Sequence, residues 1–120
     1  MTYESILQKA SVVAPGVTLV IAKMSFARRL ELATKIREIA ARLEYLNAGD
    51  GRERMEAAIL TGEVERLYVQ WGLKEIIGLL IDGEPATPDR LIDNGPEELF
   101  REALEAVKSE CSLSEAERKN

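Results

Sequence analysis

The sequence predicts a mainly α-helical fold, a small domain of three to five helices with a minor β-hairpin or a short two-stranded sheet. Two long segments repeat apolar residues at three- and four-residue steps, and a third begins at a proline followed by acidic residues. A chain of 120 residues suits one hydrophobic core. We therefore expect residues 1–120 to form a single domain, with 1–10 and 112–120 as flexible ends.

The amino-terminal part is predicted to contain the β structure. Residues 11–14 and 17–23 are β-type runs separated by Pro15-Gly16, a dipeptide typical of turns. These runs predict a small hairpin or an isolated strand.

The first long helix is predicted over residues 26–46. Ser25 can cap it, and the glycines in 47–51 can end it. Most of its charged residues fall off the apolar stripe, which predicts an amphipathic helix with a basic wet side. The stripe consists of Leu32, Ile36, Ile39, Leu43 and Leu46.

A second helix is predicted over residues 52–71. Gly62 interrupts it at a cost of about 1 kcal/mol relative to alanine, but the apolar stripe continues in phase, which favours one helix. The residues expected to face inward are Met55, Ile59, Leu60, Val64, Leu67, Tyr68 and Trp71.

The carboxyl half alternates short elements with turn residues. Residues 73–77, between two glycines, are predicted to form a helical turn or a short helix. Residues 79–83 are predicted to form a strand that enters an Asp-Gly turn and pairs with 17–23. Thr87-Pro88 predicts the start of a short helix that ends at Asn94-Gly95.

The last helix is predicted to start at Pro96, with Glu97 and Glu98 at its positive end. The final residues after Cys111 are expected to fray or to be ordered by a partner. The apolar side of the helix is formed by Leu99, Phe100, Ala103, Leu104, Ala106, Val107 and Cys111.

Composition excludes several classes of function. Histidine is absent and Cys111 is the sole cysteine, so a Ser-His-Asp triad, a Cys-His pair, a structural zinc site and an internal disulfide are not expected. Cys111 is predicted to be a semi-buried apolar residue in a reducing compartment. The acidic group Asp82, Glu84, Asp89 and Asp93 lacks the spacing of a calcium loop and is interpreted as turn and cap residues. We predict no enzyme activity, cofactor or metal.

The distribution of charge and of apolar residues indicates which classes of partner the protein can bind. Residues 24–48 hold five basic and three acidic residues, a net +2, whereas residues 77–120 hold five basic and eleven acidic, a net −6. This distribution is unfavourable for binding a phosphate backbone, so we expect no nucleic-acid partner. No stretch approaches the roughly 20 apolar residues of a membrane span, and no secretion signal is expected. A cytoplasmic protein is predicted.

The amount of amphipathic helix favours a protein-binding role, by docking of helices or by self-association. Trp71 is interpreted mainly as a core residue beside Tyr68, although large aromatic residues also serve as binding anchors. The predicted partner-binding residues are Leu32, Ile36, Ile39, Leu43, Leu46, Tyr68, Trp71, Leu99, Phe100, Val107 and Leu113.

The region 68–120 resembles the tail assembly chaperones of long-tailed bacteriophages. The resemblance lies in a tryptophan-bearing helix end, an acid-glycine turn, a threonine-proline helix start, a terminal helix and a closing Leu-Ser motif. These elements are Trp71-Gly72-Leu73, Ile81-Asp82-Gly83, Pro85-Ala86-Thr87-Pro88, Leu91-Ile92, Gly95-Pro96-Glu97-Glu98-Leu99 and Leu113-Ser114-Glu115-Ala116-Glu117-Arg118-Lys119-Asn120.

The resemblance implies a small, mainly helical, non-enzymatic protein that covers the hydrophobic helices of the tape-measure protein until tail-tube subunits replace it. It implies a role in virion morphogenesis of a phage or prophage, in the host cytoplasm. Two alternatives stay open: a structural tail component, such as a connector or completion protein, and a small regulatory protein whose basic helix (residues 28–42) enters a groove.

Overall fold

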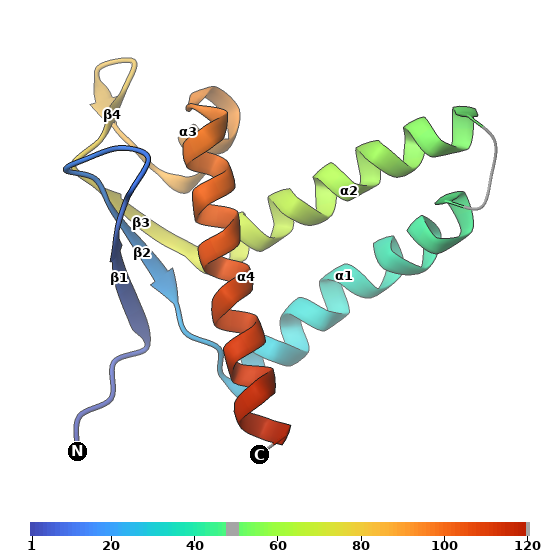
Figure 1. The fold of residues 1–120 in the computed structure, drawn as a ribbon, viewed down its shortest axis with the longest axis horizontal. Coiled ribbons are helices and arrows are strands. Elements are labelled where there is room, and N and C mark those ends of the chain that lie inside the picture. Colours follow the sequence, from blue (N-terminus) through green and yellow to red (C-terminus); the bar gives the residue numbers. More distant parts are fainter. Residues whose placement is uncertain (48–50, 120) are drawn as a thin grey trace. The chain divides into compact units, whose positions relative to one another are not determined.

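The computed structural model describes residues 1–47 and 51–119, with side chains described except at 45, 47 and 112–119. Over these residues the fold is mainly helical, as predicted, but the β part is larger than a minor hairpin because it contains a three-stranded and a two-stranded sheet (Figure 1). The elements in order are β1 (Ile6–Ala10), β2 (Thr18–Ala22), α1 (Phe26–Asn47), α2 (Gly51–Gly72), β3 (Leu73–Ile77), β4 (Leu80–Ile81), β5 (Glu84–Pro85), α3 (Pro88–Asn94) and α4 (Glu97–Lys119).

The chain divides into two compact units. Unit 1 consists of Met1–Met24 and Tyr68–Asn120, and contains both sheets together with α3 and α4. Unit 2 is the segment Ser25–Leu67, which holds α1 and most of α2. The predicted flexibility of the two ends stays a prediction.

The main sheet of unit 1 is antiparallel, with the strand order β1-β2-β3. Its central strand β2 confirms the predicted strand at 17–23, and four consecutive side chains of β2, Leu19–Ala22, are buried. The strand predicted at 11–14 is wrong, because these residues form the loop between β1 and β2. The partner of β2 in the hairpin is instead β1, whose five side chains are all exposed.

Residues 73–77 form strand β3, so the helical turn or short helix predicted there is wrong. A bulge between Val20 and Ile21 in the β2–β3 register lets Ile21 pair with Leu73 while Leu19 pairs with Ile76. The extra residue puts Leu73 and Ile76, three positions apart, among the buried side chains. This spacing imitates the period of a helix.

The strand predicted at 79–83 does enter a tight turn, but it pairs with β5 and not with β2. Asp82 and Gly83 both adopt positive φ, at 53° and 80°. Two central residues with positive φ define the type I′ turn of a two-residue hairpin, for which Asp-Gly is a favoured pair.

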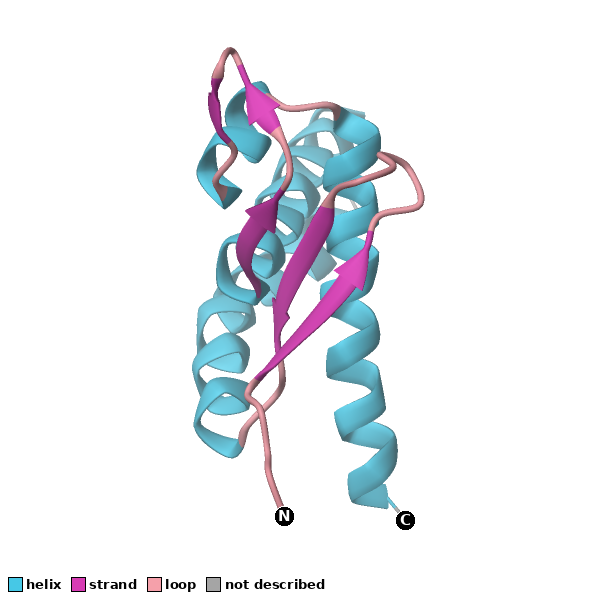
Figure 2. Ribbon diagram, turned by 90° about the vertical axis from the view of Figure 1, so that its left-hand side faces the viewer, coloured by secondary structure: helices cyan, strands magenta, loops and turns pink. Residues whose placement is uncertain are grey.

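Helix α3 begins at Pro88, as the sequence predicts, and α4 begins at Glu97, one residue after its predicted start. The Thr87 hydroxyl accepts a hydrogen bond from the Arg90 N–H at 3.2 Å, and Pro88 occupies the first turn of α3. Helix α4 lies across one face of the sheet (Figure 2). It contributes to the core of unit 1 through Leu99, Ala103, Leu104, Ala106 and Val107, all buried.

Unit 2 is a helical hairpin, which we call the arm (Figure 1). The Ser25 hydroxyl accepts a hydrogen bond from the Arg28 N–H at 3.3 Å, which confirms the predicted cap of α1. Helix α2 runs unbroken through Gly62, as predicted. Arg42 of α1 pairs with Glu56 of α2 at 2.5 Å, so the two helices lie side by side near their connection, which falls outside the described residues.

Candidate partner-binding surface

The arm exposes large apolar side chains on both of its helices. In α1, Phe26 and Leu30 are 68% and 55% exposed; in α2, Met55 and Ile59 are 71% and 65% exposed. The members of each pair are four residues apart and therefore share one face of their helix. We call them the α1 pair (Phe26 and Leu30) and the α2 pair (Met55 and Ile59).

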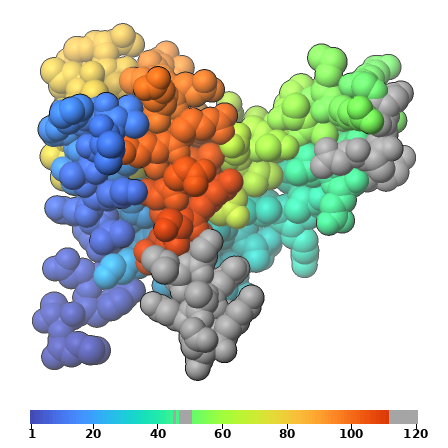
Figure 3. Space-filling view, viewed as in Figure 1, coloured from blue at the N-terminus to red at the C-terminus, as the bar shows by residue number. Residues whose placement is uncertain are grey.

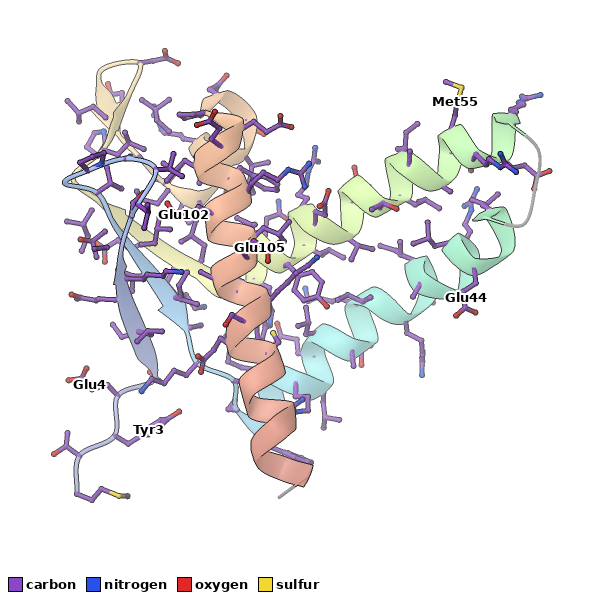
Figure 4. The ribbon with its side chains drawn as sticks, viewed as in Figure 1. Tyr3, Glu4, Glu44, Met55, Glu102 and Glu105 are labelled. Carbon is purple, nitrogen blue, oxygen red and sulfur yellow. The ribbon has the colours of Figure 1, made fainter. Side chains whose placement is uncertain are left out.

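The α2 pair corrects the sequence interpretation, which placed Met55 and Ile59 among the inward-facing residues. Figure 4 shows the Met55 side chain pointing away from α1. The more buried side of α2 is formed by Ala57, Leu60 and Val64. Residues 55, 59 and 62 fall on one face of a helix, and residues 57, 60 and 64 fall on another. This division of α2 into two faces is the sequence signal that could have separated the exposed residues from the buried ones.

The predicted partner-binding residues of α1 form the less exposed stripe of that helix. Leu32 and Leu46 are buried, and Ile36, Ile39 and Leu43 are half-buried. These five residues therefore share one side of α1, as their spacing predicts. The α1 pair lies on a different side, which the sequence analysis did not assign to partner binding.

Three of the six predicted partner-binding residues of unit 1 are in the core. Trp71, Leu99 and Val107 are buried, which confirms the interpretation of Trp71 as a core residue. Tyr68 and Phe100 are half-buried, and the side chain of Leu113 lies outside the described residues. A partner-binding role for these residues stays a prediction, and the exposed apolar surface of the arm lies elsewhere.

Close packing accounts for the burial around Val107. A Cβ built on Gly72 would lie 2.5 Å from Val107 Cγ1, closer than carbon atoms can approach. The end of α2 therefore fits against α4 only because residue 72 has no side chain. Cys111, further along α4, is half-buried as predicted.

Glu102 joins α4 to the loop between β1 and β2. Its carboxylate accepts hydrogen bonds from the Ser11 hydroxyl at 2.5 Å, the Val12 N–H at 2.7 Å and the Val13 N–H at 3.4 Å. The Ser11 oxygen in turn accepts one from the Ala14 N–H at 2.9 Å. Figure 3 shows this loop packed against α4.

These contacts lower the pKa of Glu102. Burial on its own raises the pKa, but the hydrogen bonds from Ser11, Val12 and Val13, with the positive charge of Lys9, outweigh it. The pKa therefore lies below its ordinary value of 4.5. A carboxylate held ionised by loop N–H groups is suited to anchoring the loop, because charge-assisted hydrogen bonds are stronger than neutral ones.

The described residues bring together no group of three or more Asp, Glu, Cys or His side chains able to hold a metal ion. Asp82 belongs to the type I′ turn and Asp89 to the first turn of α3, as their turn and cap interpretation predicts. Among the described helices, none is both long and apolar enough to cross a bilayer.

Comparisons with known proteins identify no relative. No family model, curated protein or solved structure matches the chain.

Proposed function

We propose that this protein is a non-enzymatic tail assembly chaperone of a phage or prophage, which binds apolar helical segments of the tape-measure protein during tail morphogenesis. The observation that carries the proposal is the exposure of the α1 pair and the α2 pair on a two-helix arm. The sequence resemblance of residues 68–120 to this class of chaperone supports the choice of partner.

The chemistry of the two pairs fits a helical partner. An amphipathic helix presents apolar residues at three- and four-residue steps, which match the four-residue spacing of Phe26 with Leu30 and of Met55 with Ile59. Burial of apolar surface contributes roughly 25 cal/mol per Å² before the costs of association. Because only a few such residues anchor the complex, tail-tube subunits can displace this protein from the tape-measure protein.

Charge around the arm favours a soluble complex. Helix α1 contains five basic and three acidic residues and α2 contains three basic and four acidic, so both helices carry mixed charge beside their apolar residues. The acidic carboxyl region adds the negative charge that keeps the chain soluble while apolar side chains stay exposed.

Co-expression tests the proposal. The full chain is produced together with apolar helical segments of the tape-measure protein from the same genome, and copurification and the soluble fraction of each segment are measured. We expect a stable complex and a larger soluble fraction. Failure to copurify with every segment, and no gain in solubility, would contradict the proposal.

Mass spectrometry of purified virions separates this proposal from a structural role in the tail. A chaperone leaves before the particle is complete and is expected to be missing from virions. Detection of the chain in amounts comparable to those of known tail proteins would favour a connector or completion protein.

A further inference from the structure

Strand β1 provides a second surface, separate from the arm. In the described part of the chain β1 pairs with β2 alone, and its five side chains are exposed. At the opposite side of the sheet, β3 carries the bulge and contacts α3. The outer edge of β1 is therefore the regular edge at which another strand can add.

Hydrogen bonds determine which backbone groups lie on this edge. The Lys23 N–H donates to the Ser5 carbonyl at 2.9 Å, and the Ser11 N–H donates to the Val17 carbonyl at 2.8 Å. Because hydrogen-bonded pairs alternate along an antiparallel ladder, Leu7 and Lys9 also bond toward β2. The N–H and C=O groups of Ile6, Gln8 and Ala10 consequently point to the open edge.

We infer that β1 pairs antiparallel with β1 of a second copy of this chain, about a two-fold axis at Gln8. In this register Gln8 lies opposite Gln8 of the other copy, and Ile6 lies opposite Ala10. Each of these pairs joins residues whose N–H and C=O groups face the edge, so the groups meet donor to acceptor. The two main sheets become one continuous sheet.

The side chains are complementary in the same register. Ile6 packs beside Ala10, and the two Gln8 amides meet at the axis, where each can donate to and accept from the other. On the other face, Leu7 lies beside Lys9, whose aliphatic stem can cover it. Lys9 is the sole charged residue of β1, so no like charges lie opposite each other. Pairing also covers Ile6 and Leu7, now 38% and 43% exposed.

Pairing between two identical edges requires a two-fold axis, because the same residues of both copies form the contact. This inference does not depend on the proposed chaperone function. A dimer without tape-measure binding, or tape-measure binding by a monomer, would separate the two.

Charge substitutions at Gln8 test the pairing. Sedimentation velocity across a dilution series is expected to show a dimer for the natural chain. Q8K and Q8E each place like charges at the axis and should weaken the dimer about fivefold. An equimolar mixture of Q8K and Q8E should recover dimerisation. The matched controls Q70K and Q70E, at an exposed position of α2, should leave the dimer unchanged.

Proline provides an independent variant. Q8P removes an N–H that points away from β2, so β1–β2 pairing persists, while two intermolecular hydrogen bonds are lost and dimerisation weakens about 30-fold. K9P removes an N–H that bonds to β2 and should lower the melting temperature instead. A natural chain that stays monomeric, or a dimer that Q8K, Q8E and Q8P all leave intact, would overturn the inference.

Discussion

At the scale of single residues, Glu102 is the side chain whose chemistry the structure specifies most fully. It connects α4 to the Ser11–Ala14 loop, two segments ninety positions apart in sequence. No local pattern marks this connection, because a glutamate on a helix and a loop ahead of a strand each have ordinary composition. Only the fold brings the carboxylate to the loop N–H groups.

The lowered pKa of Glu102 predicts a pH dependence of stability. A carboxyl whose pKa is lower in the folded state contributes stability above its unfolded pKa and loses it as pH falls through the folded pKa. We expect E102Q to cost about 1 kcal/mol at neutral pH and to reduce the loss of stability below pH 4.5.

Urea denaturation of E102Q and the natural chain between neutral and acid pH measures this effect. E105Q is the matched control, because Glu105 is an exposed glutamate on the same helix, α4 (Figure 4). Parallel stability curves for E102Q and the natural chain at all pH values would contradict the anchoring role.

Two helical glycines predict opposite effects of alanine. G62A has open space around its Cβ and should stabilise the fold by about 1 kcal/mol, because alanine is the better helix former. G72A drives its Cβ into Val107 and should destabilise by about 1–3 kcal/mol. Thermal denaturation gives both values. The cost of G72A should shrink when V107A is also present; equal costs in both backgrounds would show that the contact is unimportant.

At the scale of elements, sequence periodicity predicts the long helices and misses the short strands. The spacing in 26–46 and 52–71 identifies α1 and α2 within one or two residues of their ends. Residues 73–77 are misread because the bulge puts Leu73 and Ile76 among the buried residues at helical spacing. Strand β1 is missed because an edge strand with exposed side chains has no apolar alternation to detect.

The candidate surface, like the fold, is only partly predicted by the sequence. The less exposed stripe of α1 follows from spacing alone, but the exposure of Met55 and Ile59 does not. Apolar residues on a long helix are buried on average. When a helix has two apolar stripes, the neighbouring helix determines which of them is packed. The apolar side predicted for α4 does pack into the core, as the burial of Leu99 shows, because α4 has one dominant apolar side.

Exposed and buried apolar residues should respond differently to substitution. M55Q and I59Q change side chains that lie mostly in solvent, so each should alter stability by no more than about 0.5 kcal/mol. L99A removes a fully buried side chain and should cost about 2–5 kcal/mol. Chemical denaturation of the three variants measures the difference. A large loss for M55Q or I59Q would mean that the α2 pair holds the fold together.

At the scale of the whole molecule, the proposed chaperone function and the inferred dimer involve different units of the chain. The proposed helical partner would bind the α1 and α2 pairs, which are exposed in unit 2, and the proposed second copy would bind the edge of β1 in unit 1. The net charge of −5 supports solubility while these surfaces stay exposed.

The most direct test of the proposed function compares the affinity of arm variants for one apolar helical peptide of the tape-measure protein, measured by calorimetry. The double variant M55Q/I59Q should bind about 30-fold more weakly than the natural chain if each anchor contributes about 1 kcal/mol. The matched control V12Q/L80Q changes apolar residues of unit 1 that are at least as exposed, and it should keep the natural affinity. Unchanged affinity for M55Q/I59Q, or equal losses in both double variants, would contradict binding by the α2 pair of the arm.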